Sequence, residues 1–295
     1  MLSKFIIFMK KNIELIIQKE LKYLTGKKFS KSYICKYILP IIEYIDKTND
    51  KKFIISGSQG VGKSTLSQLI KNVIEKNSSK QVMLLSIDDY YYSKIDRYRI
   101  SQQVHPLLIT RGVPGTHDIK KLKEHLEQFK KKQFPIMTPT FNKLKDDISK
   151  KTKVFNKADI LILEGWCCGA KPIENKFLKI NLNKVEKELD KDFKWRKYYN
   201  SKLKSEYQQI FKSFDRIIYL QPPSFHFVLK WRYSQEKNNA KKTKTKNTMN
   251  KNATKNFILY YEKLTKWMIK NMPGKADMLI KIDKKQKIKK IIYYD

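Results

Sequence analysis

Residues 53–70 of this chain of 295 residues, FIISGSQGVGKSTLSQLI, contain a glycine-rich turn between two apolar runs. Phe53, Ile54 and Ile55 form a short β-branched and aromatic run, which is typical of a buried strand. After the turn, apolar residues recur at helical spacing from Leu66 onward, which predicts an amphipathic helix. Between the two runs, GSQGVGKS matches the phosphate-binding pattern G-x-x-x-x-G-K-[ST] in full. The strand and the helix that this pattern requires are therefore both present.

The chemistry of the turn explains its spacing. Glycines allow backbone angles closed to residues with a Cβ, so the main chain can curl around an anion with its N–H groups pointing inward. The helix that begins near Lys63 adds the positive end of its dipole. Lys63 would reach the β- and γ-phosphates, and the Ser64 hydroxyl would bind Mg²⁺. We therefore expect this P-loop to bind a nucleoside triphosphate.

The composition indicates the class of protein and its setting. A chain of 295 residues can bury a large core as one α/β domain. Cys35, Cys167 and Cys168 form no disulfide framework, and two of them are adjacent, which favours a reducing compartment. Residues 1–20 are apolar enough to resemble a signal peptide, but charged residues interrupt them, so we expect an amphipathic helix. No segment approaches the roughly 20 apolar residues of a membrane span, and we expect a cytoplasmic protein without membrane contact.

The formal net charge of +36 raises the question of nucleic-acid binding. The lysines are spread along the whole chain and accompany abundant Ile and Asn, a pattern that an AT-rich genome also produces. No zinc finger, heptad series or RNA-binding signature appears. We expect no dedicated nucleic-acid binding, and a surface charge that favours phosphorylated ligands. A P-loop ATPase acting on nucleic acid stays open as the less favoured alternative.

Strand and helix patterns alternate along the chain, which predicts an α/β fold with a mostly parallel sheet flanked by helices. The expected strands are Phe53–Ser56, Val82–Ser86, Ile160–Leu163, Arg216–Leu220 and Met278–Ile282. The expected helices include Ile119–Phe129, Ser201–Ser213 and Asn256–Asn271. Residues 238–256 have almost no apolar side chains and are expected to form a mobile basic insertion. We expect one domain over residues 1–295, with residues 1–45 as an N-terminal helical extension.

Acidic residues follow two of the expected strands. Asp88 and Asp89 come soon after the strand that ends at Ser86, and Glu164 closes a fully apolar run. Residues past the carboxyl ends of parallel strands lie at the crevice where such sheets bind ligands. A carboxylate there can accept a proton from a substrate hydroxyl or help to hold Mg²⁺. The alternative for the two aspartates is a helix cap or a turn, which Asp favours.

Two basic segments are candidates for binding phosphate or substrate. HPLLITRGVPGTHD, residues 105–118, is rich in turn residues and carries Arg111, a side chain suited to gripping a carboxylate. KWRYSQE, residues 230–236, places Arg232 beside the expected mobile insertion, where it could close over phosphates. Each segment has a plain alternative: a loop that only turns the chain, and a solvated helix face.

Taken together, these segments resemble the ATP-dependent kinases related to glycerate 3-kinase. Those kinases belong to the P-loop group that includes uridine kinase, phosphoribulokinase and bacterial pantothenate kinase. The matching segments run in the family's order from about Asp46 onward: GSQGVGKSTL, SIDDYYYSK, RGVPGTHD, FNKLKDD, LEGWCCGA, WRKYYN, YQQIF, WRYSQE and FILYYEKLTKWM. The resemblance implies a P-loop NTPase fold with lid and substrate-loop insertions. It also implies transfer of phosphate from ATP to a primary hydroxyl of a small hydroxy acid, D-glycerate.

The resemblance also implies roles for individual residues. Lys63, Asp88 and Arg232 would be catalytic, with Asp88 as the general base and Arg232 in the lid. Mg²⁺ would be held by Ser64 and Glu164. ATP would bind along the P-loop residues Gly57, Ser58, Gln59, Gly60, Val61, Gly62, Lys63, Ser64 and Thr65. The substrate would contact Asp89, Tyr91, Arg111, Thr116, His117, Asp118 and Glu164.

Two residues depart from the family's pattern. Asn142 stands where the F-D-K segment of the family has Asp, and Tyr90 stands in place of Phe. Asn142 leaves the acceptor open, so a kinase for a nucleoside or for pantothenate remains an alternative. Asn142 and Lys143 also begin like the guanine-binding signature N-K-x-D, but position 145 is Lys and no strand is expected before it. Guanine binding is therefore not expected.

Overall fold

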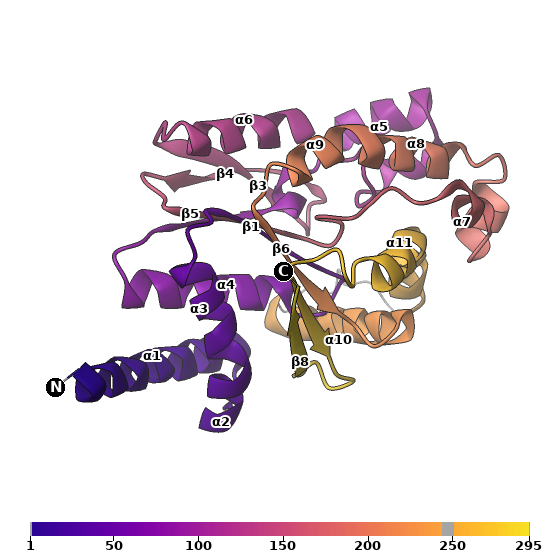
Figure 1. Ribbon diagram of the computed structural model, residues 1–295. Helices are drawn as coiled ribbons and strands as arrows, with labels where there is room; N and C mark the ends of the chain where they lie inside the picture. The colour runs from indigo at the N-terminus through magenta and orange to yellow at the C-terminus, as the bar shows by residue number, and fades with distance from the viewer. Residues whose placement is uncertain (1, 244–250, 295) are drawn as a thin grey trace.

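A six-stranded sheet in the order β2-β5-β1-β6-β7-β8 runs through the centre of the protein (Figure 1). The structure is a computed structural model, which describes the backbone of residues 2–243 and 251–294 and the side chains of residues 12–235 and 254–294. The strands of the sheet are β1 (Lys52–Gly57), β2 (Val82–Ser86), β5 (Ile160–Gly165), β6 (Arg216–Gln221), β7 (Met278–Ile282) and β8 (Ile288–Tyr293).

The pairing of the strands is parallel except at one edge. β1 lies inside the sheet, parallel to both β5 and β6. β2 pairs in parallel with β5, and β7 with β6, whereas β8 is antiparallel to β7. Each of the five predicted strands lies within one of these strands, and the prediction of an α/β fold with a mostly parallel sheet is confirmed.

Helices cover both faces of the sheet, which explains why its strands are apolar on both sides. In β1, Ile54 belongs to one buried core, whereas Phe53 and Ile55 belong to the other. The first core includes residues of α6 (Ile119–Lys130), of the helical run at 194–211 and of α11 (Lys251–Asn271). The second includes residues of α1 (Leu2–Thr25), α3 (Leu39–Lys47) and α4 (Lys63–Asn77) (Figure 1).

Two of the predicted helices begin earlier in the chain than expected. The run expected from Ser201 starts at Lys194 and continues through α8 (Lys194–Lys202), η5 (Leu203–Tyr207) and α9 (Gln208–Phe211). α11 starts at Lys251 rather than Asn256, whereas α6 starts at Ile119 as predicted. The other helical elements are α2 (Lys31–Tyr33), η1 (Ile34–Ile38), η2 (Ile87–Tyr90), α5 (Lys94–Gln103), η3 (Pro106–Ile109), α7 (Asn175–Lys179), η4 (Val185–Leu189) and α10 (Phe225–Thr243).

Both ends of the basic segment 238–256 are helical. α10 extends into it as far as Thr243, and α11 occupies it from Lys251. The remainder of the predicted mobile insertion, residues 244–250, lies outside the described residues. Near the N-terminus, the elements from α1 to α3 are helical over most of the segment predicted as a helical extension (Figure 1). In the described part of the chain, the helices that are long enough to cross a bilayer are not sufficiently apolar to do so.

The structure contains a hairpin, separate from the main sheet, that was not predicted from the sequence. It pairs β3 (Ile136–Asn142) antiparallel to β4 (Asp147–Phe155). The expectation that no strand precedes Asn142 is therefore wrong. Most side chains of β4 are exposed, so no alternation of apolar and polar residues marks it in the sequence. The turn of this hairpin carries Lys143.

Candidate active site

A cavity of about 380 Å³ lies at the carboxyl ends of β1 and β5. Six of the nine P-loop residues line it: Gln59, Gly60, Gly62, Lys63, Ser64 and Thr65. Five further residues that the sequence singled out line the same cavity: Asp88, Tyr91, Arg111, Glu164 and Arg232. Segments far apart in the sequence therefore meet at the crevice that a parallel sheet forms beyond its carboxyl ends.

The P-loop has the backbone that its glycines allow. Gly60 and Gly62 have φ angles of 74° and 105°, and α4 begins at the next residue, Lys63. The Lys63 ammonium donates a hydrogen bond of 2.9 Å to the Ser58 carbonyl oxygen, which holds the buried side chain against the loop. Burial lowers the pKa of Lys63, and the nearby Glu164 carboxylate opposes that shift. Gly57, Ser58 and Val61 are buried in the loop itself.

Two hydroxyl groups converge on the carboxylate of Glu164. Ser64 donates to Glu164 Oε1 at 3.1 Å, and Ser86 at the end of β2 donates to the same oxygen at 2.8 Å. The parallel register of β2 and β5 places Ser86 directly beside Glu164. Hydroxyl and carboxylate oxygens are the ligands that Mg²⁺ prefers, so Ser64 and Glu164 fit a magnesium ion beside the P-loop.

Asp88 faces the cavity from the short η2 helix after β2. The Tyr91 hydroxyl donates to its Oδ1 at 3.1 Å, and the Lys143 ammonium donates to its Oδ2 at 2.7 Å. Burial by itself raises the pKa of Asp88, but its charged neighbours oppose this, chiefly Lys143 through its charge and its hydrogen bond, so the pKa lies below its usual value. Asp88 is thus an ionised carboxylate on the cavity wall.

Asp89 has a different set of partners from its neighbour. Its Oδ1 accepts a hydrogen bond of 3.1 Å from the Phe141 backbone N–H, and its Oδ2 accepts one of 2.8 Å from Lys153. Both partners belong to the β3–β4 hairpin. Asp89 does not line the cavity; it attaches the hairpin to the sheet.

The loop RGVPGTHD forms bonds within itself and with the helices that cover it. Thr116 Oγ1 donates to the Val113 carbonyl oxygen at 2.7 Å, and the Asp118 carboxylate accepts from the Lys121 N–H at the start of α6. Neither side chain lines the cavity. A Cβ at Gly112, whose φ is 141°, would overlap with the Tyr261 ring. The loop therefore packs too closely on α11 for a larger residue there.

His117 supports the cavity wall from behind. Its ring stacks on Tyr91 with centroids 4.3 Å apart, and its Nδ1 lies 2.6 Å from the Tyr207 hydroxyl. Burial lowers the pKa of His117 to about 3, although the Asp88 carboxylate opposes that shift. The imidazole is therefore neutral near neutral pH, and it fixes the orientation of Tyr91.

The remaining wall of the cavity is cationic and aromatic. The Arg111 guanidinium lies 5.4 Å from the centre of the Phe141 ring and forms an ion pair with Asp146. The Arg232 guanidinium lies 5.8 Å from the ring of Phe257 on α11. Nine further residues of the cavity wall were not predicted as site residues: Lys143, Gly165, Trp166, Trp231, Ser234, Gln235, Phe257, Tyr261 and Gln286. Most of them lie in segments that carry the family resemblance. The resemblance of those segments could therefore have pointed to these residues, whereas the chemistry of each residue alone could not.

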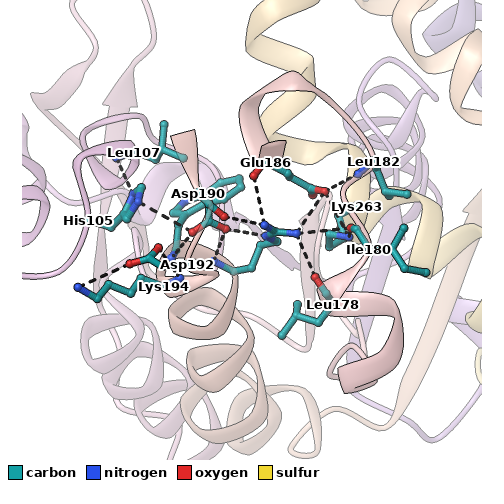
Figure 2. Close-up of polar contacts among 12 residues, drawn as sticks. His105, Leu107, Leu178, Ile180, Leu182, Glu186, Asp190, Asp192, Lys194 and Lys263 are labelled. Carbon is teal, nitrogen blue, oxygen red and sulfur yellow. Dashed lines mark hydrogen bonds and ion pairs between the residues drawn. The ribbon is translucent and has the colours of Figure 1, made fainter. Parts of the chain in front are cut away.

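A second cluster has the spacing of metal ligands, but the carboxylate of Asp190 in it is already paired with Arg196 (Figure 2). The ligand atoms of His105, Asp190 and Asp192 all lie within 4.8 Å of one another. Asp190 Oδ2, however, lies 2.6 Å from Arg196 Nε, and Asp190 Oδ1 accepts from the Trp195 N–H at 2.9 Å. A guanidinium at that distance repels a cation, so we interpret the cluster as a structural ion pair.

The same ion pair is part of a buried network that reaches Glu186 and Lys263 (Figure 2). Arg196 is fully buried, and its Nη1 lies 3.8 Å from Glu186 Oε2. The ammonium of Lys263, on α11, lies 3.3 Å from the same oxygen. Because α11 also carries Phe257 and Tyr261, this buried network connects the helix at 194–202 to the cavity wall.

Comparison with known proteins shows what the chain resembles. No family model matches it. It is 29% identical over 239 residues to the uncharacterized kinase mug58 of Schizosaccharomyces pombe, which covers 76% of this chain and 83% of that protein. It is 34% identical over 156 residues to the probable ATP-dependent kinase TDA10 of Saccharomyces cerevisiae, which covers 45% of this chain and 54% of that protein.

A solved structure confirms the fold. The D-glycerate 3-kinase of Cryptococcus neoformans superposes with a TM-score of 0.69 at 24% sequence identity, over 88% of this chain and 97% of that one. Three observations indicate a P-loop kinase: the six-stranded sheet, the complete P-loop and the kinase relatives. The chain therefore resembles P-loop kinases related to glycerate 3-kinase and pantothenate kinase, and its complete P-loop together with these relatives indicates an ATP-dependent kinase.

Proposed function

We propose that this kinase transfers the γ-phosphate of Mg·ATP to a hydroxyl of a small hydroxy acid, D-glycerate. The observation that carries the proposal is that a P-loop and the ionised carboxylate of Asp88 line one cavity. Phosphoryl transfer depends mainly on positioning and on neutralising charge, and one shared cavity provides both.

The side chains fit each part of the transfer step. Lys63 and Arg232 neutralise the phosphate charge, while Asp88 lies beside the acceptor. The acceptor oxygen forms a bond to the γ-phosphorus as its proton passes to Asp88. The bond from that phosphorus to the bridging oxygen breaks, and ADP leaves with the electron pair.

Ser64 and Glu164 would hold the Mg²⁺ that accompanies ATP. Their oxygens lie 3.1 Å apart on the cavity wall, beside the P-loop. A bound Mg²⁺ supplies charge neutralisation for the β- and γ-phosphates. Chelation with EDTA should therefore abolish turnover, and excess Mg²⁺ should restore it.

The charge of the cavity favours an acidic acceptor. Lys63, Arg111, Lys143 and Arg232 contribute four cationic side chains, against the carboxylates of Asp88 and Glu164. Two of these cations, Arg111 and Lys143, come from the loop and the hairpin rather than from the nucleotide side. D-glycerate carries a carboxylate for such a cation and hydroxyls for Asp88, and a relative with the same fold is named for this substrate.

A screen of acceptors tests the proposal. Purified protein is incubated with Mg·ATP and D-glycerate, uridine or pantothenate, ADP release is followed, and the products are identified by mass. We expect saturable formation of phosphoglycerate, with much slower transfer to the other two acceptors. Phosphorylated uridine or pantothenate with inert D-glycerate would overturn the choice of acceptor while leaving the kinase chemistry intact.

A further inference from the structure

The base and the acceptor side of the cavity share an ion pair that the proposed reaction must disturb. Asp88 Oδ2 accepts from Lys143 at 2.7 Å, and Asp88 Oδ1 accepts from Tyr91 at 3.1 Å. An incoming hydroxyl must compete for one of these two oxygens. An ammonium on the carboxylate also makes it a weaker proton acceptor, because the ion pair stabilises the charged form. One of the two contacts therefore has to yield before Asp88 can take a proton.

Lys143 is the contact that can yield. The Tyr91 side chain is buried, with 4% of its surface exposed, and it is stacked on His117. The Lys143 side chain is 58% exposed and ends a flexible stem. Breaking the Tyr91 contact would require the packed wall to move, whereas Lys143 needs only to rotate its side chain.

The backbone of Lys143, in contrast, is firmly placed. The Asn142 side-chain oxygen accepts hydrogen bonds of 3.0 Å from the N–H groups of both Leu144 and Lys145, which closes the turn of the hairpin. Asp89 attaches the same hairpin to the sheet through the Phe141 N–H. A fixed backbone and an exposed side chain let the ammonium move within the cavity without leaving it.

The other cation on this side already has a fixed carboxylate partner. Arg111 is paired with Asp146, which is not part of the cavity lining and also accepts a hydrogen bond of 3.0 Å from Arg97. The rings of Phe141 and Phe257 lie 5.4 and 5.9 Å from the Arg111 guanidinium. Arg111 is therefore immobilised. Lys143, in contrast, is paired with Asp88, which is the proposed general base.

We propose that Lys143 determines specificity for anionic acceptors by exchanging its partner, leaving Asp88 for the carboxylate of the bound acceptor. This assignment rests on the proposed transfer to a hydroxy acid. A neutral acceptor has no anionic group for the Lys143 ammonium, so Lys143 stays paired with Asp88. The carboxylate is then less able to accept the proton of the acceptor hydroxyl. An acidic acceptor provides that anion and frees the base in the same event.

Variants of two lysines in the same turn test the exchange in the whole chain of 295 residues. Lys143→Met removes the ammonium, Lys143→Arg retains a cation, and Lys145→Met changes an exposed lysine of the same turn. KM and kcat are measured for D-glycerate, together with the inhibition constant of D-lactate, which keeps the carboxylate and lacks the primary hydroxyl. The KM for ATP serves as an internal control for the nucleotide side.

The expected result is a loss of acceptor binding rather than of chemistry. In Lys143→Met the KM for D-glycerate and the inhibition constant of D-lactate should rise together by roughly 10- to 100-fold, as for a lost charge-assisted hydrogen bond. Lys143→Arg should recover part of this loss, and Lys145→Met should leave both constants unchanged.

Two other outcomes have distinct meanings. A fall in kcat for Lys143→Met with both constants unchanged would show that Lys143 acts only on Asp88, and it would overturn the exchange. If the wild-type protein forms no phosphoglycerate but phosphorylates another acceptor, the proposed function fails at an earlier step, and the assignment of Lys143 falls with it.

Discussion

Asp88 and Asp89 are adjacent in the sequence, but their side chains have separate tasks. Asp88 lines the cavity, whereas Asp89 holds the hairpin. Removing a positioned general base typically costs about 10²- to 10⁴-fold in rate. We predict a fall in kcat within that range for Asp88→Asn, with ATP binding little changed, measured by steady-state kinetics and nucleotide titration. Asp89→Asn is the matched control and should lower kcat less; the reverse order would exchange the two roles.

The ion pair of Asp88 also determines the acidic side of the pH profile. Because Lys143 lowers the pKa of Asp88, the base stays ionised as the pH falls, until the pH reaches that lowered value. In Lys143→Met burial remains and raises the pKa, so the acidic limb of kcat/KM should move to higher pH. Profiles of kcat/KM against pH for both proteins measure the shift. Superimposable acidic limbs would contradict the role of Lys143.

Site residues that belong to a motif or follow a strand can be predicted from the sequence. Residues that reach the site only because the fold brings distant segments together cannot. The P-loop and Asp88 are predicted because a motif or a strand end marks them. Lys143 escapes because its partner is 55 residues away, and only the hairpin brings the two together. The structure also shows what Asn142 does: its side-chain oxygen closes the turn, a task for which an amide and a carboxylate are equally suited.

At the scale of elements, periodicity predicts what is buried and fails where a strand is exposed. β5 is buried at every position, so its apolar run marks it clearly. β4 has no buried residue, and β8 forms an edge of the sheet with half-buried and exposed positions. A strand without an apolar face leaves no alternation in the sequence, so β4 could not be predicted. In β8, Ile288, Ile291 and Ile292 pack against the two cores, but two lysines separate the first from the others, so the sequence does not alternate there either.

The buried ion network beside α11 yields a prediction about stability. Arg196 is fully buried and bonded to Asp190, so Arg196→Met would leave the Asp190 carboxylate buried without its partner. Removing one partner of a buried pair typically costs about 3–5 kcal/mol. We predict a loss of this size in the free energy of unfolding, measured by urea denaturation.

A matched control for this prediction lies two residues away. Lys194 pairs with Asp192 at 3.6 Å, with both side chains exposed, and such surface pairs contribute little. Lys194→Met should therefore leave the urea midpoint nearly unchanged. Equal effects of the two substitutions would mean that burial of the network does not stabilise the fold.

For the whole molecule, the net charge of +36 has two competing interpretations. A protein that acts on nucleic acid should hydrolyse ATP faster when RNA or DNA is added, and its binding should weaken steeply with salt. A small-molecule kinase should respond to its acceptor instead. We predict that D-glycerate stimulates ADP release and that RNA and DNA do not. Strong stimulation by nucleic acid, with none by D-glycerate, would favour the alternative.

In the proposed reaction, phosphate passes within one cavity from the P-loop to an acceptor hydroxyl, and this transfer depends on Lys63. Lys63 is buried against the loop and bonded to the Ser58 carbonyl oxygen, where it can reach the phosphates of ATP. The measurement is acceptor-dependent ADP release by Lys63→Ala beside the wild type, with circular dichroism to establish that both are folded. We predict that the folded variant loses turnover. Turnover at the wild-type rate in that variant would contradict phosphate transfer from this P-loop.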